Sequence, residues 1–214
     1  MRALRIALAQ GTLLADTRVA LEAAGLATDA LADGGRRLVL PTADVEFVLA
    51  RPGDVPTHVA HGAADIGIVG KDVLLETDAD VLELVDLGYG QCRFVVAAPT
   101  GSVDRSLDEY RHLGSLEVAT KYPRVAERHF QGRGMQVEII KLNGSVELAP
   151  QVGLADWIVD LVSTGRTLAE NRLSIVEEIA TCTARLIANR VSYARDRERI
   201  AALASKLEAW ASAR

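Results

Sequence analysis

The sequence predicts an α/β fold with mainly parallel sheets. Apolar runs of strand length alternate along the chain with amphipathic segments of helix length, and this alternation is typical of strands joined by helical crossovers. Hydrophobic residues make up 49% and charged residues 25% of the 214 residues, a balance typical of a folded globular protein. Aromatic residues are only 4%, so Leu, Val, Ile and Ala must build the core. The length suffices for one large domain or two small lobes.

The first part of the chain supplies strands separated by helices. The expected strands are short apolar runs at 4–10, 45–51, 65–70, 81–87 and 92–99. A helix is expected over 13–25, where Gly25 closes it. Another helix follows the second strand, with Asp54 in position to cap it and Pro56 in position to open it.

The second part continues the same alternation. Strands are expected at 116–120, 135–142 and 156–162, with a helix from Pro123 to about Gln131 between the first two. A last helix near 194–213 carries an apolar stripe of Ile200, Leu203, Leu207 and Trp210. The polar stretch at 99–114 is the one place where the composition suggests that a first lobe gives way to a second.

Charge and cysteine content limit the classes of function. A formal net charge of −5 argues against a general nucleic-acid binder, although a few Arg and Lys side chains in a cleft can still attract a small polyanion. Cys92 and Cys182 are ninety residues apart and belong to no ligand pattern, which favours two buried thiols in a reducing cytosol. His58 and His61 are three apart on a predicted helix but lack a third ligand, so no metal site is expected. The N-terminal apolar run is too short for a signal peptide, and no stretch reaches the length of a membrane span, so we expect a cytoplasmic protein.

The segment 153–173 carries the clearest chemical signal. Its strand places Asp156 and Asp160 on one face and runs into Ser-Thr-Gly-Arg at 163–166. Thr167 and Glu170 fit a capping box, which predicts a helix from Leu168. A glycine-containing loop between a strand and a helix N-terminus directs backbone N–H groups at an anion, so the segment is a candidate phosphate site. An ordinary strand–turn–helix with an N-cap is the alternative.

The amino-acid sequence of this segment resembles that of a known loop. "VDLVSTGRTL" looks like the phosphoribosyl-pyrophosphate loop of phosphoribosyltransferases. Together with "DVEFVLARPGDVPTHVAHGAADIGIVGKDVLLE", "DLGYGQCRFVVAAP", "VATKYPRVAERHF" and "EIIKLNGSVELAP", it is similar to the short form of the ATP phosphoribosyltransferase family over nearly the whole chain. The resemblance implies a two-lobed fold like that of periplasmic binding proteins, with a central active-site cleft. Lobe one is then expected at 1–91 plus 184–214, and lobe two at 92–183.

The resemblance also implies a reaction. N1 of the adenine ring of ATP displaces pyrophosphate from C1 of phosphoribosyl pyrophosphate, which gives phosphoribosyl-ATP in the first step of L-histidine biosynthesis. Because N1 is a modest nucleophile, the protein must position it and stabilise the departing pyrophosphate. Mg²⁺ is implied as a cofactor carried by the substrate phosphates, without a cage of protein carboxylates.

The family motif assigns the donor site residue by residue. Six residues of the loop are expected to hold the 5′-phosphate: Ser163, Thr164, Gly165, Arg166, Thr167 and Leu168. Asp160 and Glu147 are the candidates for the ribose hydroxyls, and Glu147 is also a candidate to take the proton released from the adenine amino group. For Glu147 the alternative is a solvated carboxylate at the start of a helix.

Cations and glycines at strand ends are the expected ATP and pyrophosphate site. Arg51 is assigned to catalysis, and Gly11, Gly67, Gly70, Lys71 and Arg93 to ATP binding. Each cation taken alone is as well explained as a surface charge, and Gly67 and Gly70 as positions of strand–helix packing. The chain departs from the family at Gln10-Gly11-Thr12, where many members have Lys-Gly-Arg, so the role of this loop is in doubt.

Partners follow from the family as well. The short form is expected to act with a separate regulatory subunit that resembles a histidyl-tRNA synthetase, and as a dimer of catalytic subunits, without nucleic acid or membrane. Two rival classes share the fold or the loop. One is a binding module, such as a periplasmic receptor or the effector lobe of a transcription regulator, and the other is a phosphoribosyltransferase that uses a different base.

Overall fold

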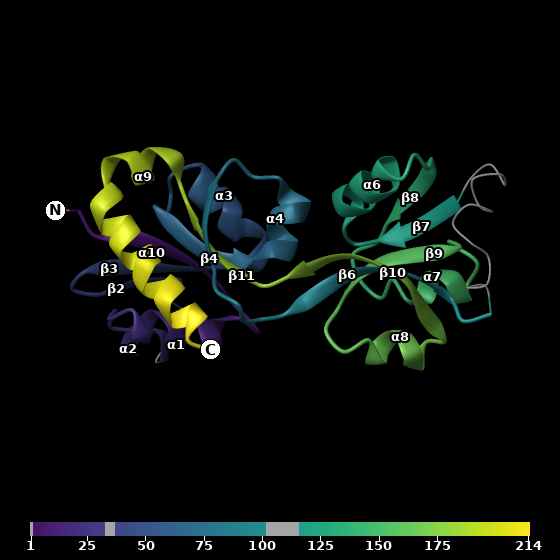
Figure 1. The fold of residues 1–214 in the computed structure, drawn as a ribbon, viewed down its shortest axis with the longest axis horizontal. Coiled ribbons are helices and arrows are strands. Elements are labelled where there is room, and N and C mark those ends of the chain that lie inside the picture. The colour runs from purple at the N-terminus through teal and green to yellow at the C-terminus, as the bar shows by residue number, and fades with distance from the viewer. Residues whose placement is uncertain (1, 33–36, 102–115) are drawn as a thin grey trace. The chain divides into compact units, whose positions relative to one another are not determined.

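The computed structural model describes residues 2–32, 37–101 and 116–214. Most of the polar stretch at 99–114, where composition suggests a boundary, lies outside these residues. The chain divides into two compact units (Figure 1). Unit 1 comprises Met1–Gln91 and Thr183–Arg214, and unit 2 comprises Cys92–Cys182.

Unit 1 is built on a mixed sheet whose described strands have the order β2-β3-β1-β4-β11-β5. Their bounds are β1 Leu4–Ala9, β2 Val39–Pro41, β3 Val45–Ala50, β4 Ile66–Gly70, β5 Leu82–Asp86 and β11 Ala184–Ala188. β3, β1 and β4 are parallel, so their carboxyl ends share one edge of the sheet. β2 and β11 are antiparallel to their neighbours.

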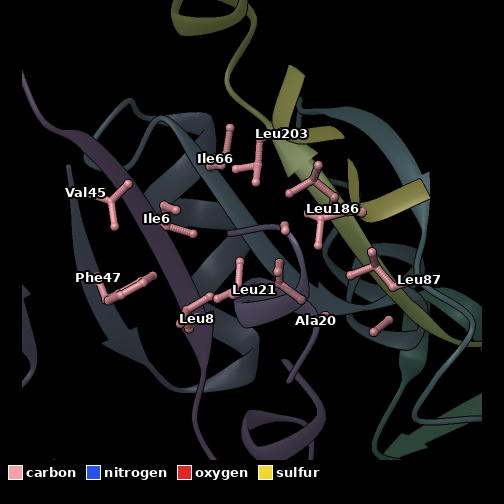
Figure 2. Close-up of a cluster of buried hydrophobic side chains, with 14 of the residues drawn as sticks. Ile6, Leu8, Ala20, Leu21, Val45, Phe47, Ile66, Leu87, Leu186 and Leu203 are labelled. Atoms are coloured by element: carbon pink, nitrogen blue, oxygen red, sulfur yellow. The ribbon is translucent and has the colours of Figure 1, made fainter. Parts of the chain in front are cut away.

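Helices cover both faces of this sheet. They are α1 Leu14–Ala23, α2 Asp29–Ala32, the 3₁₀ turn η1 Pro52–Asp54, α3 Val55–Ala60, α4 Lys71–Thr77, α9 Arg190–Arg195 and α10 Arg197–Ser212. Ile6 and Leu8 of β1 pack with Leu21 of α1 and Leu203 of α10 in one core (Figure 2). A second cluster packs α3 on the sheet through Val55 and Val59.

Unit 2 has a mixed sheet whose described strands have the order β10-β6-β9-β7-β8. The bounds are β6 Cys92–Pro99, β7 Leu116–Thr120, β8 Val137–Lys141, β9 Trp157–Val162 and β10 Leu173–Cys182. β9, β7 and β8 are parallel, whereas β10, β6 and β9 pair antiparallel. α6 Pro123–Gly132 lies on one face, and α7 Leu148–Gln151 and α8 Arg166–Glu170 lie on the other (Figure 1).

The α/β class expected from the sequence is present in both units, but each parallel centre has antiparallel strands beside it. Three of these strands, β2, β10 and β11, escaped the sequence analysis. The expected helix at 194–213 is two helices that meet at Asp196, and Asn189 caps the first by accepting a 2.9 Å hydrogen bond from Ser192 N. In the described part of the chain, no helix is long and apolar enough to span a membrane.

Candidate active site

Three strands of unit 2 end at the same edge of their sheet. The parallel register pairs Thr120 of β7 with Val159 of β9 on one side and with Lys141 of β8 on the other. The Thr120 hydroxyl donates a 2.7 Å hydrogen bond to the carbonyl of Val159, which fixes this register inside the buried sheet. The segments that follow β7 and β8 therefore start side by side, whereas β9 continues to Val162 before its own following segment starts.

The segment after β9 is the expected phosphate loop. Ser163 and Thr164 are exposed, and Gly165 has a φ of +77°, which only glycine adopts without strain. This turn starts the helix α8 at Arg166, with Gly165 as its N-cap and the Thr164 hydroxyl 3.4 Å from Arg166 N. The loop thus has the strand–glycine–helix order that exposes successive N–H groups.

The predicted capping box is wrong. Thr167 lies inside the first turn of α8 rather than at its cap, because the left-handed Gly165 lets the helix begin two residues earlier than expected. Glu170 does not reach back to the cap, since its Oε1 accepts a 2.7 Å hydrogen bond from Nε of Arg166. Leu168 is buried in the core of unit 2, so it anchors the loop through its side chain and has only its backbone to offer a ligand.

Asp160 and Glu147 lie within electrostatic reach of each other beside this loop. Asp160 is the third residue from the end of β9, and Glu147 precedes the first turn of α7, which packs on β9. The pKa of the Asp160 carboxyl is raised to about 6, mainly by burial and also by the negative charge of Glu147, whereas a backbone hydrogen bond from Leu161 and the Lys121 ammonium act to lower it. In the ligand-free protein, the hydrogen bonds and the positive charge near Asp160 thus do not offset the cost of burying its carboxylate.

Lys121 is a residue that the sequence analysis missed. It follows Thr120 just as Asp160 follows Val159, so the register of β7 with β9 brings the two together. Its only sequence signal was its place inside "VATKYPRVAERHF". By contrast, Asp156 was expected on the same strand as Asp160, and the strand begins only after it. It precedes β9, is exposed, and accepts a 3.2 Å hydrogen bond from Glu117 N at the opposite end of the strand.

Arg93 lies at the same edge of unit 2. It pairs in register with Val162, the last residue of β9, so it flanks the start of the phosphate loop. Its guanidinium is 2.8 Å from Glu178 of β10, and this hydrogen bond holds the pKa of the Glu178 carboxyl below its usual range. Arg93 therefore lies with the phosphate loop of unit 2, and not with the predicted ATP-binding residues at the strand ends of unit 1.

A second group of predicted residues gathers in unit 1, at the carboxyl ends of β1, β3 and β4. Gln10 N donates a 2.9 Å hydrogen bond to the carbonyl of Ala50, which sets the loop with Gly11 beside Arg51. Gly11 is exposed and has a φ of +99°, so the turn itself requires glycine there. Arg51 is exposed, and no ion pair among the described residues involves its guanidinium.

Lys71 opens α4 directly after β4, as the sequence suggested. Its ammonium is not solely directed to solvent, since Nζ lies 2.6 Å from Oε2 of Glu83 on β5. Any anion at Lys71 must share the cation with this carboxylate.

The two predicted glycines of β4 have structural explanations. A Cβ on Gly67 would lie 2.9 Å from Val59 and 3.2 Å from the carbonyl of Ala7, so the residue is glycine because α3 packs closely on the sheet. Gly67 is buried and has no surface to offer ATP. At Gly70 the nearest side chain is the Asp72 carboxylate, whose charge would repel a phosphate approaching from that side.

The fold and the loop after β9 together define an α/β protein with a candidate phosphate site at the carboxyl ends of parallel strands. The sequence profile of the family described as "HisG: ATP phosphoribosyltransferase" matches residues 51–209. The chain therefore belongs to the ATP phosphoribosyltransferase family.

Individual relatives agree with this assignment. An ATP phosphoribosyltransferase of Rubrobacter xylanophilus is 55% identical over 90% of this chain and 89% of its own length. That of Moorella thermoacetica is 53% identical over 96% of this chain and 92% of its own length. The resemblance drawn from the sequence blocks is thus confirmed.

Solved structures confirm the two-lobed fold class. The chain matches an ATP phosphoribosyl transferase (HisG:HisZ) complex from Thermotoga maritima with a TM-score of 0.83 and 36% identity, covering 99% of this chain and 100% of that one. It also matches a periplasmic sulfonate-binding protein of Methylobacillus flagellatus with a TM-score of 0.63 and 17% identity, covering 97% of this chain and 67% of that one. The second likeness concerns the fold alone.

Proposed function

We propose that this chain transfers the 5-phosphoribosyl group of phosphoribosyl pyrophosphate to N1 of ATP, giving phosphoribosyl-ATP and pyrophosphate in histidine biosynthesis. The observation that carries the proposal is the phosphate loop after β9, set beside Asp160 and Glu147 in a chain of the ATP phosphoribosyltransferase family. The alternative of a phosphoribosyltransferase that uses a different base is disfavoured, because the ATP phosphoribosyltransferase relatives match outside this loop as well.

The loop is the proposed site for the 5′-phosphate. The first N–H groups of a helix have no partner inside it, so those of Thr167 and Leu168 are available to phosphate oxygens, and that of Arg166 would exchange its 3.4 Å hydrogen bond to the Thr164 hydroxyl for a phosphate oxygen. The exposed hydroxyls of Ser163, Thr164 and Thr167 add donors. Because α8 has only five residues, its dipole is small, and direct hydrogen bonds must supply most of the binding energy.

The two carboxylates are proposed to hold the ribose. A carboxylate accepts hydrogen bonds from adjacent hydroxyls, and bound hydroxyl donors favour the charged form of Asp160 that burial opposes. Glu147 is proposed to accept the proton of the adenine amino group as N1 attacks C1 and the bond to pyrophosphate breaks. Lys121 then balances part of the negative charge at this edge.

Mg²⁺ fits the donor set only as an ion that the substrate brings. The described residues contain no group of three or more His, Cys, Asp or Glu able to hold a metal. Asp160 and Glu147 provide one or two carboxylate oxygens, which suits an ion whose other ligands are phosphate oxygens and water. When bound, Mg²⁺ would neutralise charge on the leaving pyrophosphate.

The cations of the strand ends are proposed to receive the remaining phosphates. Arg51 is the proposed catalytic cation for pyrophosphate, because its guanidinium is exposed at the edge where β1 and β3 end. Lys71 and the backbone around Gly11 and Gly70 are proposed for ATP. Arg93 is proposed to bind a phosphate group next to the loop, and this phosphate would replace Glu178 as the partner of the guanidinium.

The test is ATP-dependent release of pyrophosphate from phosphoribosyl pyrophosphate. Purified chain with Mg²⁺ should release pyrophosphate with ATP and not with GTP, and a Glu147→Gln variant should release it more slowly. If folded protein releases none, with or without a regulatory subunit, the chain is a binding module and the proposal fails.

A hetero-oligomer belongs to the same proposal. The Thermotoga maritima structure is of a HisG:HisZ complex, and this chain aligns with all of the matching chain in it. We infer that a regulatory subunit resembling a histidyl-tRNA synthetase carries the histidine site, next to a dimer of catalytic chains in the cytoplasm. Histidine titrated into the chain alone should neither bind nor inhibit, and saturable inhibition without a partner would contradict the inference.

A further inference from the structure

The two cysteines of the chain lie directly opposite each other on neighbouring strands. Cys92 is the first residue of β6 and Cys182 is the last residue of β10. The antiparallel register pairs them, and it is regular from the Ala180–Phe94 pair onward, after the irregularities earlier in β10. The 89 residues between the two cysteines conceal this pair from a sequence search for short cysteine motifs.

Backbone geometry makes the pair suitable for a disulfide. Directly opposed residues in an antiparallel pair have Cα atoms about 4.5–5.5 Å apart and side chains on the same face. A disulfide requires a Cα separation of about 4.4–6.8 Å, so the ladder already supplies it. Both cysteines belong to the described residues, and both carry reduced thiols there.

The exposures of the two thiols differ and set an order of reaction. Cys92 is half-buried, whereas Cys182 is buried with a relative exposure of 1%. An oxidant from solution therefore reaches Cys92 first, and Cys182 is protected until a partner sulfur is activated. This arrangement of an accessible cysteine beside a second one is what a reversible thiol site requires.

We propose that Cys92 and Cys182 form a dithiol site that a peroxide converts reversibly into a cross-strand disulfide. The Cys92 thiolate attacks hydrogen peroxide, the O–O bond breaks, and Cys92 becomes a sulfenic acid as hydroxide leaves. The Cys182 thiolate then attacks this sulfur, the S–O bond breaks, and hydroxide leaves as the S–S bond forms. The two protons that the thiols released on ionising convert the two hydroxides to water. Two thiols are oxidised and one peroxide is reduced to two waters.

Cys92 and Cys182 are the first and last residues of unit 2 in the sequence. The disulfide joins these two ends of unit 2 covalently, one residue before Arg93 and one residue before Thr183, whose carbonyl accepts a 2.9 Å hydrogen bond from Lys71 N. We therefore expect oxidation to lower turnover, a consequence that rests on the proposed function, whereas the thiol chemistry does not.

The experiment oxidises the purified full chain with a small excess of hydrogen peroxide and maps its peptides without reduction. The expected product links the peptides of Cys92 and Cys182 within one chain, with a loss of two hydrogen atoms, and dithiothreitol reverses it. Cys92→Ser should leave Cys182 a thiol in the folded protein. Cys182→Ala should stop at a sulfenic acid on Cys92 that dimedone traps.

Three results would overturn the site: both thiols intact after peroxide, a disulfide between two chains, or irreversible oxidation of Cys92 with Cys182 unchanged. The wild-type map decides the matter even if Cys182→Ala fails to fold, which circular dichroism would reveal. Pyrophosphate release measured on the same samples should fall and recover with dithiothreitol in the wild type only. Crosslinked protein with full turnover would refute the effect on activity, and reduced protein without turnover would instead count against the proposed function.

Discussion

Lys71 and Glu83 form an ion pair with 2.6 Å between Nζ and Oε2, at the edge of unit 1 where ATP is proposed to bind. Glu83 is shared, because Nε of Arg185 is 3.3 Å from its other oxygen. Both partners of the Lys71–Glu83 pair are partly exposed, and such a pair is worth about 0–1 kcal/mol. A phosphate can therefore displace Glu83 at little cost.

Replacing Glu83 should accordingly strengthen ATP binding. We expect Glu83→Gln to lower the dissociation constant of ATP by about three- to fivefold, the equivalent of about 1 kcal/mol. Isothermal titration calorimetry checks this value. Asp80→Asn is the matched control, because it removes the exposed 2.6 Å pair of Asp80 with Arg190 elsewhere in unit 1. Equal affinity in both variants would remove Lys71 from the ATP site.

The phosphate loop should depend on the backbone of Gly165. We expect Gly165→Ala to weaken binding of phosphoribosyl pyrophosphate at least tenfold, because a side chain at a φ of +77° shifts the N–H groups of the loop. Gly134→Ala is the control, since Gly134 also has a positive φ of +66° and no atom near its would-be Cβ. Both variants should lose roughly 1–2 kcal/mol of stability. Equal donor affinity in the two would refute the loop assignment.

Asp160 should trade stability for binding. Its folded-state pKa of about 6 lies above that of the unfolded chain, so the native protein binds more protons between about pH 4 and 6, and stability contributed by this group falls as the pH rises through that window. Asp160→Asn should therefore be more stable than the wild type above pH 6, by on the order of 2 kcal/mol. It should also bind the donor more weakly.

Thermal unfolding of the ligand-free proteins from pH 4.5 to 8 checks the difference between Asp160→Asn and wild type. Asp156→Asn serves as the comparison, because Asp156 is exposed and lies at the other end of β9. A difference that stays constant with pH would show that Asp160 titrates normally.

Arg51 should act on the transition state. We expect Arg51→Ala to lower turnover by the equivalent of about 2–4 kcal/mol, with a smaller effect on ATP binding, because a charge that meets the leaving pyrophosphate matters most as the bond breaks. Steady-state kinetics separates kcat from KM. Arg18→Ala, on the exposed 3.5 Å pair with Glu22 in α1, should change neither constant. An unaltered kcat for Arg51→Ala would exclude it from catalysis.

Local sequence patterns predicted those elements that local forces define. The strand at 116–120 agrees with β7 to the residue, and Gly25 ends α1 with a φ of +88°. The apolar stripe predicted for the last helix is also confirmed, since Ile200, Leu203 and Leu207 are buried in the core of unit 1. β10 escaped because Glu177 and Glu178 interrupt its apolar pattern, and two irregularities in register break the alternation of its faces.

The candidate site was predictable where a motif is contiguous and not where pairing joins distant segments. The loop at 163–168 follows from its own residues, apart from the helix start, which depends on the left-handed φ of Gly165. Lys121 beside Asp160 and Cys92 opposite Cys182 follow from strand register, which short sequence windows do not encode. The sequence could not separate the two explanations of Gly67, because close packing under α3 and close approach to a ligand both require glycine, and the structure supports the packing explanation.

The position of β11 has a consequence for synthesis on the ribosome. β11 lies between β4 and β5, yet it is made only after all of unit 2. Unit 2 is continuous in sequence, so its five described strands are available before β11, an inner strand of unit 1, emerges. Until then the facing edges of β4 and β5 are open to wrong partners. We therefore expect nascent chains released before Ala184 to carry a folded unit 2 and an aggregation-prone, protease-sensitive unit 1.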